Sequence, residues 1–414
     1  MNNYIAELPQ YLPDRPSLKV LMLQRNWSLK WIPPNLFQCM PALTYLDLSN
    51  TELEDLPKEI GRLVQLQYLN LSSTYIEALP KELACLKEMK YLLLSFVRSS
   101  PLRIPRGAIS NLSKLRLLDL YGTEYEVWQV EGGRGHGNEE NTASLEELEE
   151  LNSKVMSSTT LQITVNAVPA LKMLSRFDNV VTRQLHITRM SSSASIQLTP
   201  SIVKAQLGSL KILKSLQSLT IENNESLVEL EVDGEDRDHD MDWRLPDLAY
   251  LELLNLKKLK VVNWTSVSIS NFLPQLQSVT ILECLELENA NWVLLLPRLE
   301  NLNIEICWKM QRVIDDSVGN HVGYNSAPAF RCLREMKLSQ LGSLTSICND
   351  AISFPSLEII EIHYCHKLKQ LPVKIMGSTL REIRGAKEWW QNLQWQDENV
   401  KASLLPYFRK WPSN

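Results

Sequence analysis

The sequence predicts an α/β solenoid, a fold in which one short structural unit repeats along the chain and stacks on its neighbours. Three observations carry this prediction: leucines with a fixed spacing, their recurrence 23 residues later, and a shared Leu-Pro ending. The two copies lie within residues 43–80, with Leu43, Leu46 and Leu48 followed by Leu66, Leu69 and Leu71. A fixed period near 23 residues is the signature of a leucine-rich repeat. An ordinary amphipathic helix would lack this long period.

Further copies are spaced along most of the chain. Predicted strand cores begin at Leu18, Leu43, Leu66, Met89 and Leu115, then less regularly near Leu161 and Leu185, and again at Leu216, Leu248, Leu276, Leu299, Leu333, Leu357 and Leu380. We therefore expect a leucine-rich-repeat horseshoe of about 14 repeats, with a parallel β-sheet on its concave face. One repeat cannot bury its own apolar side, so the copies have to stack.

The pattern divides the chain into five segments. We expect a partial first repeat at 1–17, regular leucine-rich repeats at 18–130, an acidic and glycine-rich loop with a helix at 131–157, irregular repeats at 158–380 and a C-terminal cap at 381–414. Residues 4–9 match residues 75–80 without a preceding strand, which favours the C-terminal portion of a longer protein. The large apolar area of the cap comes from Trp389, Trp390, Trp395, Tyr407 and Phe408.

The inserted segment is expected to contain one helix. Leu145, Leu148 and Leu151 recur at helical spacing over residues 144–156, and Ser144 followed by Glu147 is typical of a capping box. Two other polar stretches, residues 231–242 and 315–328, are expected to be loops.

Composition excludes several classes of function. The net charge is −5, which argues against a nucleic-acid-binding surface. Residues 131–150 and 231–242 each carry −6, so the remainder of the chain is about +7. We find no signal peptide and no run of 18 apolar residues that could span a membrane. Seven cysteines without an export signal favour a reducing compartment, and we expect the cytoplasm.

Three cysteines could be read as a metal site, since His363 and His366 lie near one of them. Cys284, Cys307 and Cys365 each fall eight positions after the first leucine of a repeat, however. The same position elsewhere holds Asn26, Thr51, Thr74, Thr123 and Asn224. A small side chain at this position turns inward and satisfies backbone groups of the turn. We expect buried thiols and no metal.

The sequence contains no catalytic motif that we can identify. The glycine-rich stretch at 132–137 lacks the following Lys-Ser/Thr of a phosphate loop, and no nucleophile elbow or zinc-protease motif occurs. We therefore expect neither an enzyme nor a bound cofactor.

The variable residues between the leucines are the candidate protein-binding residues, because they should point out of the concave face. One column across the strands contains Tyr45, Tyr68 and Tyr91, and the next contains Asp47 and Asn70. Stacked exposed tyrosines are typical of interface anchors. Cross-strand packing also favours aromatic residues, and the sequence does not decide between the two.

Later strands place glutamates at outward positions, namely Glu222, Glu252, Glu305 and Glu361. The concave face is therefore expected to be aromatic at one end and acidic in its middle and far end.

The stretches at 40–94, 104–128 and 387–395 (KEWWQNLQW) resemble the repeat region of plant nucleotide-binding leucine-rich-repeat resistance proteins of the coiled-coil class. The resemblance covers nearly the whole chain. It implies an intracellular immune receptor whose nucleotide-switched domain is held inactive by the repeats, which also help to sense pathogen effectors. Implied partners are the receptor's own or an associated nucleotide-binding domain, a pathogen effector, or a guarded host protein. This chain has no phosphate loop, so nucleotide binding is not carried over.

Two functions remain open on the sequence. The first is the sensing and autoinhibitory module of such a receptor. The second is a self-standing repeat scaffold or decoy that works without a nucleotide-binding domain. An extracellular receptor domain is more distant, although Asn26-Trp27-Ser28 and Asn263-Trp264-Thr265 are formal glycosylation sequons.

Overall fold

The computed structural model describes residues 5–9, 13–98, 102–123, 145–155, 159–165, 174, 177, 180–188, 195–197, 215–233, 245–265, 269–315, 330–348, 352–372, 379–395 and 398–411. The chain divides into two compact units. The first contains residues 1–186 and 206–213, and the second contains residues 187–205 and 214–414. Each unit is described below by itself.

The first unit is built on a sheet whose strands follow one another in sequence order. These strands are β1 (Val20–Met22), β2 (Tyr45–Asp47), β3 (Tyr68–Asn70), β4 (Tyr91–Leu93), β5 (Leu117–Leu120) and β6 (Thr159–Val165), followed by β7 (Val180–Thr188) as far as residue 186. Strands β1 to β6 pair in parallel, with Leu46, Leu69 and Leu92 in register. These three leucines are fully buried, so the repeated leucine pattern forms the core.

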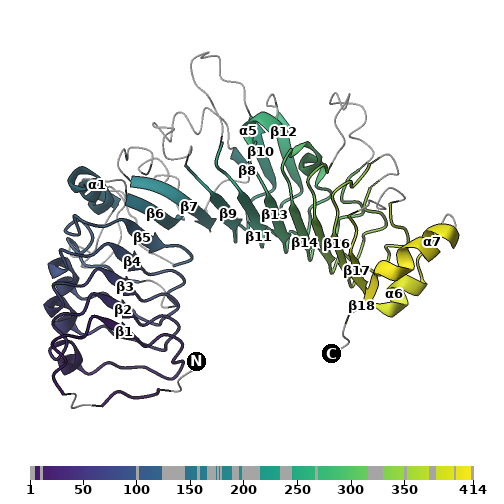
Figure 1. Ribbon diagram of the computed structural model, residues 1–414. Coiled ribbons are helices and arrows are strands. Elements are labelled where there is room, and N and C mark those ends of the chain that lie inside the picture. Colours follow the sequence, from purple (N-terminus) through teal and green to yellow (C-terminus); the bar gives the residue numbers. More distant parts are fainter. Residues whose placement is uncertain are drawn as a thin grey trace. The chain divides into compact units, whose positions relative to one another are not determined.

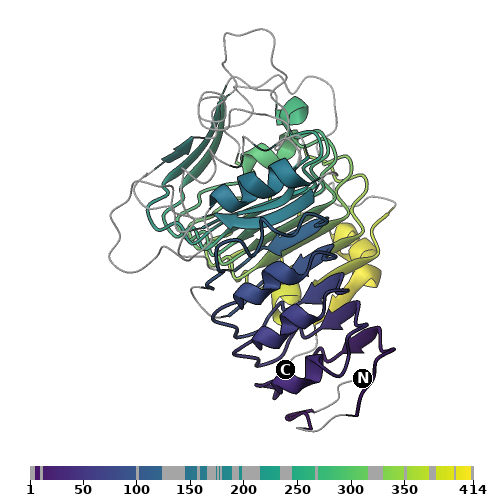
Figure 2. The same ribbon diagram turned by 90° about the vertical axis from the view of Figure 1, so that its left-hand side faces the viewer.

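Short helices return the chain on the side opposite the sheet, as Figures 1 and 2 show for this unit. They are the 3₁₀ helices η1 (Pro34–Phe37), η2 (Lys58–Arg62) and η3 (Lys81–Cys85). The residue that precedes each helix is a proline, namely Pro33, Pro57 and Pro80. Proline has no backbone N–H to leave unsatisfied at a helix start. The repeated Leu-Pro ending therefore marks where each returning helix begins.

The inserted helix α1 (Leu145–Lys154) packs onto the first unit through Leu148 and Leu151, which are fully buried. Glu147 is also buried, and its carboxylate accepts hydrogen bonds from the backbone N–H of Gly107, of Ile109 at 3.2 Å and of Ser110 at 3.4 Å. Glu147 therefore satisfies backbone N–H groups of the turn at 107–110. The expected capping partner Ser144 lies outside the described residues, as does the whole expected loop at 131–142 with its glycine-rich stretch.

The second unit continues the same architecture. Its main sheet contains β9 (Ser218–Glu222), β11 (Tyr250–Leu254), β13 (Ser278–Leu282), β14 (Asn301–Glu305), β15 (Glu335–Ser339), β16 (Ile359–His363), β17 (Glu382–Gly385) and β18 (Phe408–Lys410), all parallel. The helices α5 (Ile269–Phe272) and η4 (Asn291–Leu295) lie between strands along the chain. The parallel sheets and regular repeats confirm the predicted leucine-rich-repeat solenoid.

A second, three-stranded sheet was not anticipated. Strands β8 (Ser195–Gln197) and β12 (Val261–Thr265) pair in parallel on either side of β10 (Glu229–Asp233). The expectation of a loop over 231–242 is therefore wrong for its first three residues, which belong to β10. Parallel pairing with two neighbouring repeats outweighs the polar composition of this stretch. Residues 234–242, and residues 316–328 of the other expected loop, lie outside the described residues.

The C-terminal segment covers the last repeat with aromatic side chains. Helices α6 (Lys387–Gln391), α7 (Glu398–Leu404) and η7 (Leu405–Tyr407) precede β18. The rings of Trp390 and Phe408 stack with their centroids 4.5 Å apart, and Trp390 also contacts Trp395. Trp389 donates its indole N–H to the backbone carbonyl of Leu368 at 3.1 Å. Large apolar area and a satisfied indole together protect the core at this end.

Strands β1 to β5, β9, β11 and β13 to β16 each end in the same tight turn. One residue adopts a positive φ and the next turns into the core, as in Asn50-Thr51, Ser73-Thr74, Glu283-Cys284, Ile306-Cys307 and Tyr364-Cys365. The left-handed conformation costs L-residues about 1–2 kcal/mol, with asparagine and glycine tolerating it best. Ile306, with a φ of 56°, is the β-branched exception among the described turns.

The inward residue satisfies backbone carbonyls of its own and neighbouring repeats. Thr51 and Thr74 donate to the carbonyls of Leu48 and Leu71 at 2.8 and 2.6 Å. Cys284 and Cys365 contact carbonyls of their own repeat and also reach the preceding repeat, with their thiols 3.6 Å from the carbonyls of Leu253 and Leu338. Cys307 contacts the carbonyl of Glu305 at 3.5 Å. The expectation of buried thiols in the turn ladder is confirmed: all three cysteines are free and at most 2% exposed.

The strained turn at Ile306 generates a prediction. Ile306→Asn should raise the free energy of unfolding by about 1 kcal/mol, because asparagine adopts a positive φ with less strain. The reciprocal change, Asn50→Ile, should lower it by a similar amount. Urea unfolding followed by circular dichroism would measure both. An unchanged or lower stability of Ile306→Asn would show that the half-buried isoleucine contributes more by packing than it loses by strain.

The thiol ladder generates a second prediction. Burial raises the pKa of Cys284 to about 12 and that of Cys365 to about 11, so neither thiol forms much thiolate at pH 8. In the native protein, a thiol reagent should label the exposed Cys85 and leave Cys284, Cys307 and Cys365 unmodified until urea is added. Mass spectrometry of digested protein would locate the label. Rapid native labelling of the three buried thiols, or stoichiometric zinc, would contradict the ladder.

Candidate functional site

The tyrosine column of the first unit forms one continuous strip on the sheet face. Tyr45, Tyr68 and Tyr91 are in register on adjacent strands β2, β3 and β4. The rings of Tyr45 and Tyr68 stack in parallel with centroids 4.1 Å apart, and Tyr91 is tilted by 44° at 6.2 Å from Tyr68. All three side chains are half-buried. The strip thus packs across strands and still presents ring surface to solvent.

The electrostatic surroundings of the central tyrosine differ from those of a free phenol. Burial, and then a hydrogen bond with Tyr45, raise the pKa of Tyr68 above its ordinary value. Tyr68 is therefore a neutral hydroxyl under all physiological conditions. A neutral aromatic strip with polar tips is suited to protein contacts, because rigid amphipathic rings bury area at low entropic cost.

The second predicted column is less available for binding than the sequence indicated. Asp47 is buried, and its carboxylate accepts hydrogen bonds from the backbone N–H of Ser49 at 2.9 Å and from the Ser49 hydroxyl at 2.7 Å. Asn70 accepts from the backbone N–H of Ser72 at 3.0 Å and remains half-buried. Short polar side chains at strand ends fold back onto the turn, as their chemistry favours.

Asp119 occupies the same column on β5, two strands from Asn70 in the sheet. Its carboxylate accepts from the backbone N–H of Tyr121 at 3.0 Å and is only 6% exposed. Burial raises the pKa of Asp119 above its ordinary value, although the hydrogen bonds from Tyr121 and Ser95 oppose this. Asn70 and Asp119 therefore each accept a hydrogen bond from the backbone N–H two residues later. Asn70 does so with a neutral amide, and Asp119 with a buried carboxyl.

The four predicted glutamates do not form one acidic column. Glu222 and Glu305 stand at the ends of β9 and β14, whereas Glu252 and Glu361 stand at the middle of β11 and β16. No two of the four are register partners on adjacent strands. The expectation of an acidic far end is therefore wrong in its pattern, because the cations of Lys337 and Arg384 alternate there with Glu305 and Glu361.

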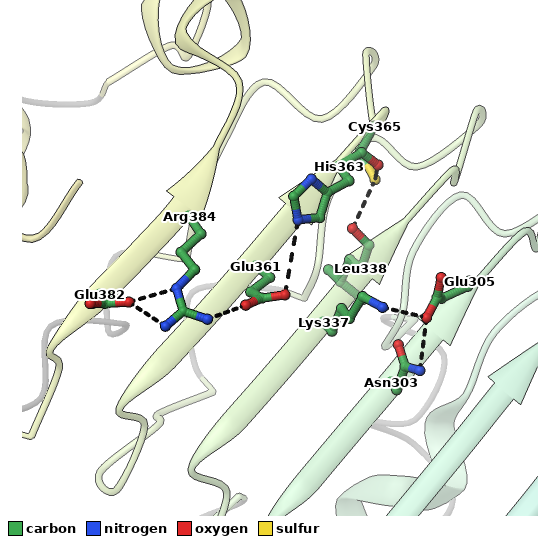
Figure 3. A network of polar contacts seen from close by, with 9 residues as sticks. All are labelled: Asn303, Glu305, Lys337, Leu338, Glu361, His363, Cys365, Glu382 and Arg384. Atoms are coloured by element: carbon green, nitrogen blue, oxygen red, sulfur yellow. Dashed lines mark hydrogen bonds and ion pairs between the residues drawn. The ribbon is translucent and has the colours of Figure 1, made fainter. Parts of the chain in front are cut away.

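Lys337 and Arg384 supply these cations (Figure 3). Lys337 lies in register with Glu361 and donates to Glu305 at 2.7 Å. Arg384 binds Glu361 on one side and Glu382, at 2.6 Å from its Nε, on the other. The His363 ring lies 3.9 Å from Glu361. These groups form the charged network of the second unit, which spans four strands.

Three side chains of the charged network have pKa values shifted by their surroundings. Burial acts to raise the pKa of Glu305, but hydrogen bonds from Lys337 and Asn303 outweigh it and lower that pKa. The hydrogen bonds that Arg384 donates to Glu361 and Glu382 raise the pKa of its guanidinium. Burial lowers the pKa of His363 against the opposing charge of Glu361, so this imidazole is neutral at pH 7.

A second row of charged side chains lies at the residues that immediately precede β14, β15, β16 and β17. Arg334 is 3.8 Å from Glu300 and 3.2 Å from Glu358, and Arg381 is 3.2 Å from Glu358. Counting from each repeat's first leucine would have found both rows. Lys337, Glu361 and Arg384 each fall four positions after Leu333, Leu357 and Leu380.

Two kinds of feature are absent from the described residues, namely metal-binding side-chain groups and membrane-spanning helices. No group of three or more His, Cys, Asp or Glu side chains there is arranged to hold a metal ion. Across the same residues, no helix has the length and apolarity needed to cross a bilayer.

The buried carboxyl of Asp119 generates a prediction. Asp119→Asn should raise the free energy of unfolding at neutral pH, because the amide keeps the acceptor for Tyr121 and avoids the desolvated charge. A carboxyl whose pKa is raised on folding destabilises the folded state most at pH values above that raised pKa, where the buried group is charged. The gain should therefore be full at neutral pH and vanish as pH falls below the ordinary carboxyl range.

Denaturant titrations of Asp119→Asn at several pH values would measure this gain, with the exposed Asp55→Asn as a matched control. A gain that grows towards low pH would contradict the assignment.

Comparisons with known proteins agree with this geometry. Residues 4–132 match the family described as leucine-rich repeat region, and residues 289–384 match that of plant disease resistance protein RPS2-like leucine-rich repeats. Disease resistance protein At4g27190 of Arabidopsis thaliana is 27% identical over 99% of this chain and 47% of its own length. Disease resistance protein RPS5 of the same plant is 27% identical over 99% of this chain and 41% of its own length.

The chain thus spans less than half the length of these curated relatives. The match extends over both compact units, including the turn ladder and both candidate surfaces. The chain therefore belongs to the leucine-rich-repeat proteins and is homologous to the repeat regions of plant disease resistance proteins.

Proposed function

We propose that this chain is the protein-binding module of an intracellular plant immune receptor, acting in effector sensing and in restraint of the receptor's nucleotide-binding domain. The observation that carries the proposal is homology to disease resistance proteins over 99% of the chain. The repeat sheet supports it, because such faces present side chains in fixed register to a partner. Binding, and not catalysis, is the proposed activity, and the cytoplasm is the proposed location.

The tyrosine strip is the proposed contact with the nucleotide-binding domain. Tyr45, Tyr68 and Tyr91 are neutral, prearranged by stacking and half-exposed, which are properties of interface anchors. Asn70 offers a polar side chain beside them. Asp47 supports the strip through its turn bonds and contributes less direct contact.

The charged network is the proposed contact with an effector or a guarded host protein. Glu305 and Glu361 are engaged by Lys337 and Arg384, so this surface presents alternating charges. Alternating charges contribute more to the specificity of binding than to its affinity, because a partner has to present the opposite sign at each position. Glu222 and Glu252 extend the proposed surface to β9 and β11.

The tyrosine strip can be tested in a receptor that carries this chain behind a nucleotide-binding domain. Combining Tyr68→Ala with Tyr91→Ala should weaken the resting contact about thirtyfold, the typical effect of losing an anchor. The receptor should then cause cell death in leaf tissue without a pathogen. Transient expression, with protein levels measured by immunoblot, would show this.

Two matched controls separate binding from packing. Phenylalanine at both positions keeps the stacked rings and should leave the receptor quiet. Tyr250→Ala removes an exposed tyrosine from the second unit and should do the same. Alanine variants that accumulate normally and stay inactive would show that the tyrosines serve only cross-strand packing.

A further inference from the structure

A shallow hollow lies at the edge of the second unit, where strands β14, β15 and β16 end. Trp308, Gln340, Gly342 and Tyr364 line it, each from the turn that follows one of these strands. The two aromatic side chains are unusually open, with Trp308 57% and Tyr364 69% exposed. Exposed large aromatic residues on both sides of a hollow indicate a contact surface.

The middle turn is what keeps the hollow open. A Cβ atom placed on Gly342 would have no heavy atom within 4 Å, so the space above this residue is empty. The turns on either side carry Trp308 and Tyr364. Because β14 and β16 are two strand spacings apart, their turns lie roughly 10 Å from each other. This spacing leaves room for one apolar side chain between the aromatic residues.

The rim of the hollow is basic. The three turns at 306–309, 340–343 and 364–367 contain Lys309 and Lys367 and no acidic residue. Lys309 pairs with Glu286 of the preceding turn but keeps 58% of its side chain exposed. Lys367 and His366 are also exposed. A partner bound here would be favoured if it carried acidic residues beside its apolar anchor.

We propose that this hollow binds an extended segment of a partner protein, which inserts one apolar side chain between Trp308 and Tyr364. Acidic residues flank that anchor in the partner and face Lys309 and Lys367. The aromatic walls supply affinity through buried area, and the lysines supply selectivity. This edge site is separate from the tyrosine strip and the charged network.

A displayed library of random 12-residue peptides, selected on the intact chain at physiological salt, tests the proposal. The enriched peptides should share one leucine, proline or aromatic anchor with aspartate or glutamate close to it. The best peptide is then synthesised with a fluorophore, and its Kd is measured by fluorescence polarisation.

Three variants assign the binding. Gly342→Trp fills the hollow without a backbone clash, and Trp308→Ala removes one wall. Each should weaken binding about thirtyfold. Lys367→Glu should weaken it less and remove the preference for acidic residues. Lys369→Glu, the same charge change at an exposed residue outside the hollow, should have little effect. Unchanged unfolding midpoints would confirm that the variants are folded.

Three results would overturn the proposal. Enrichment that survives Gly342→Trp, peptides without acidic preference, or no enrichment above the Gly342→Trp protein would each refute it. Loss of binding in Tyr68→Ala would assign the peptides to the sheet face instead. Because Tyr68→Ala should leave this site intact, failure here and failure of the proposed receptor function can be told apart.

Discussion

The turn that ends each strand is the constraint on which the rest of the structure depends. A residue with positive φ reverses the chain, and the next side chain enters the core. Where that side chain is polar or a thiol it donates to a backbone carbonyl, and leaving such a buried carbonyl unsatisfied would cost about 1–3 kcal/mol. Val97, Leu256 and Leu341 fill the same position with apolar side chains. Threonine, asparagine and cysteine can all fill this position because each is small and donates a hydrogen bond. The turn fixes where each strand ends, and therefore which residues share a column.

Shared register has opposite consequences in the two units. In the first, it brings three neutral aromatic rings together, so packing and exposure reinforce one another along the tyrosine strip. In the second, it sets glutamates beside cations, so these charged side chains pair with one another on the sheet face. Exposed ion pairs contribute little to stability singly, and a network of them mainly fixes side-chain positions. A partner of this surface therefore meets a rigid pattern of charge.

The turns also create surface features of their own. Because the inward position is buried, the residues on either side of it project outward at the edge of the sheet. Trp308 and Tyr364 project in this way, while Gly342 leaves a gap between them. The same backbone device thus holds the core together and arranges an aromatic hollow. Strain at Ile306 is located in one of these turns, next to Cys307.

The sequence alone determined the repeats, the strand cores, the inward cysteines and the tyrosine column, because each follows from a fixed spacing that local geometry translates directly into position. It also contained the charge alternation, through the equivalent positions of Lys337, Glu361 and Arg384. Only the tertiary structure decided how far neighbouring residues bury each side chain or occupy its hydrogen-bonding groups. The hydrogen bonds that Glu147 accepts from the turn at 107–110, the second sheet around β10 and the gap above Gly342 depend on how residues far apart in sequence are placed. Spacing specifies a side chain's direction, whereas its availability depends on what the folded chain places beside it.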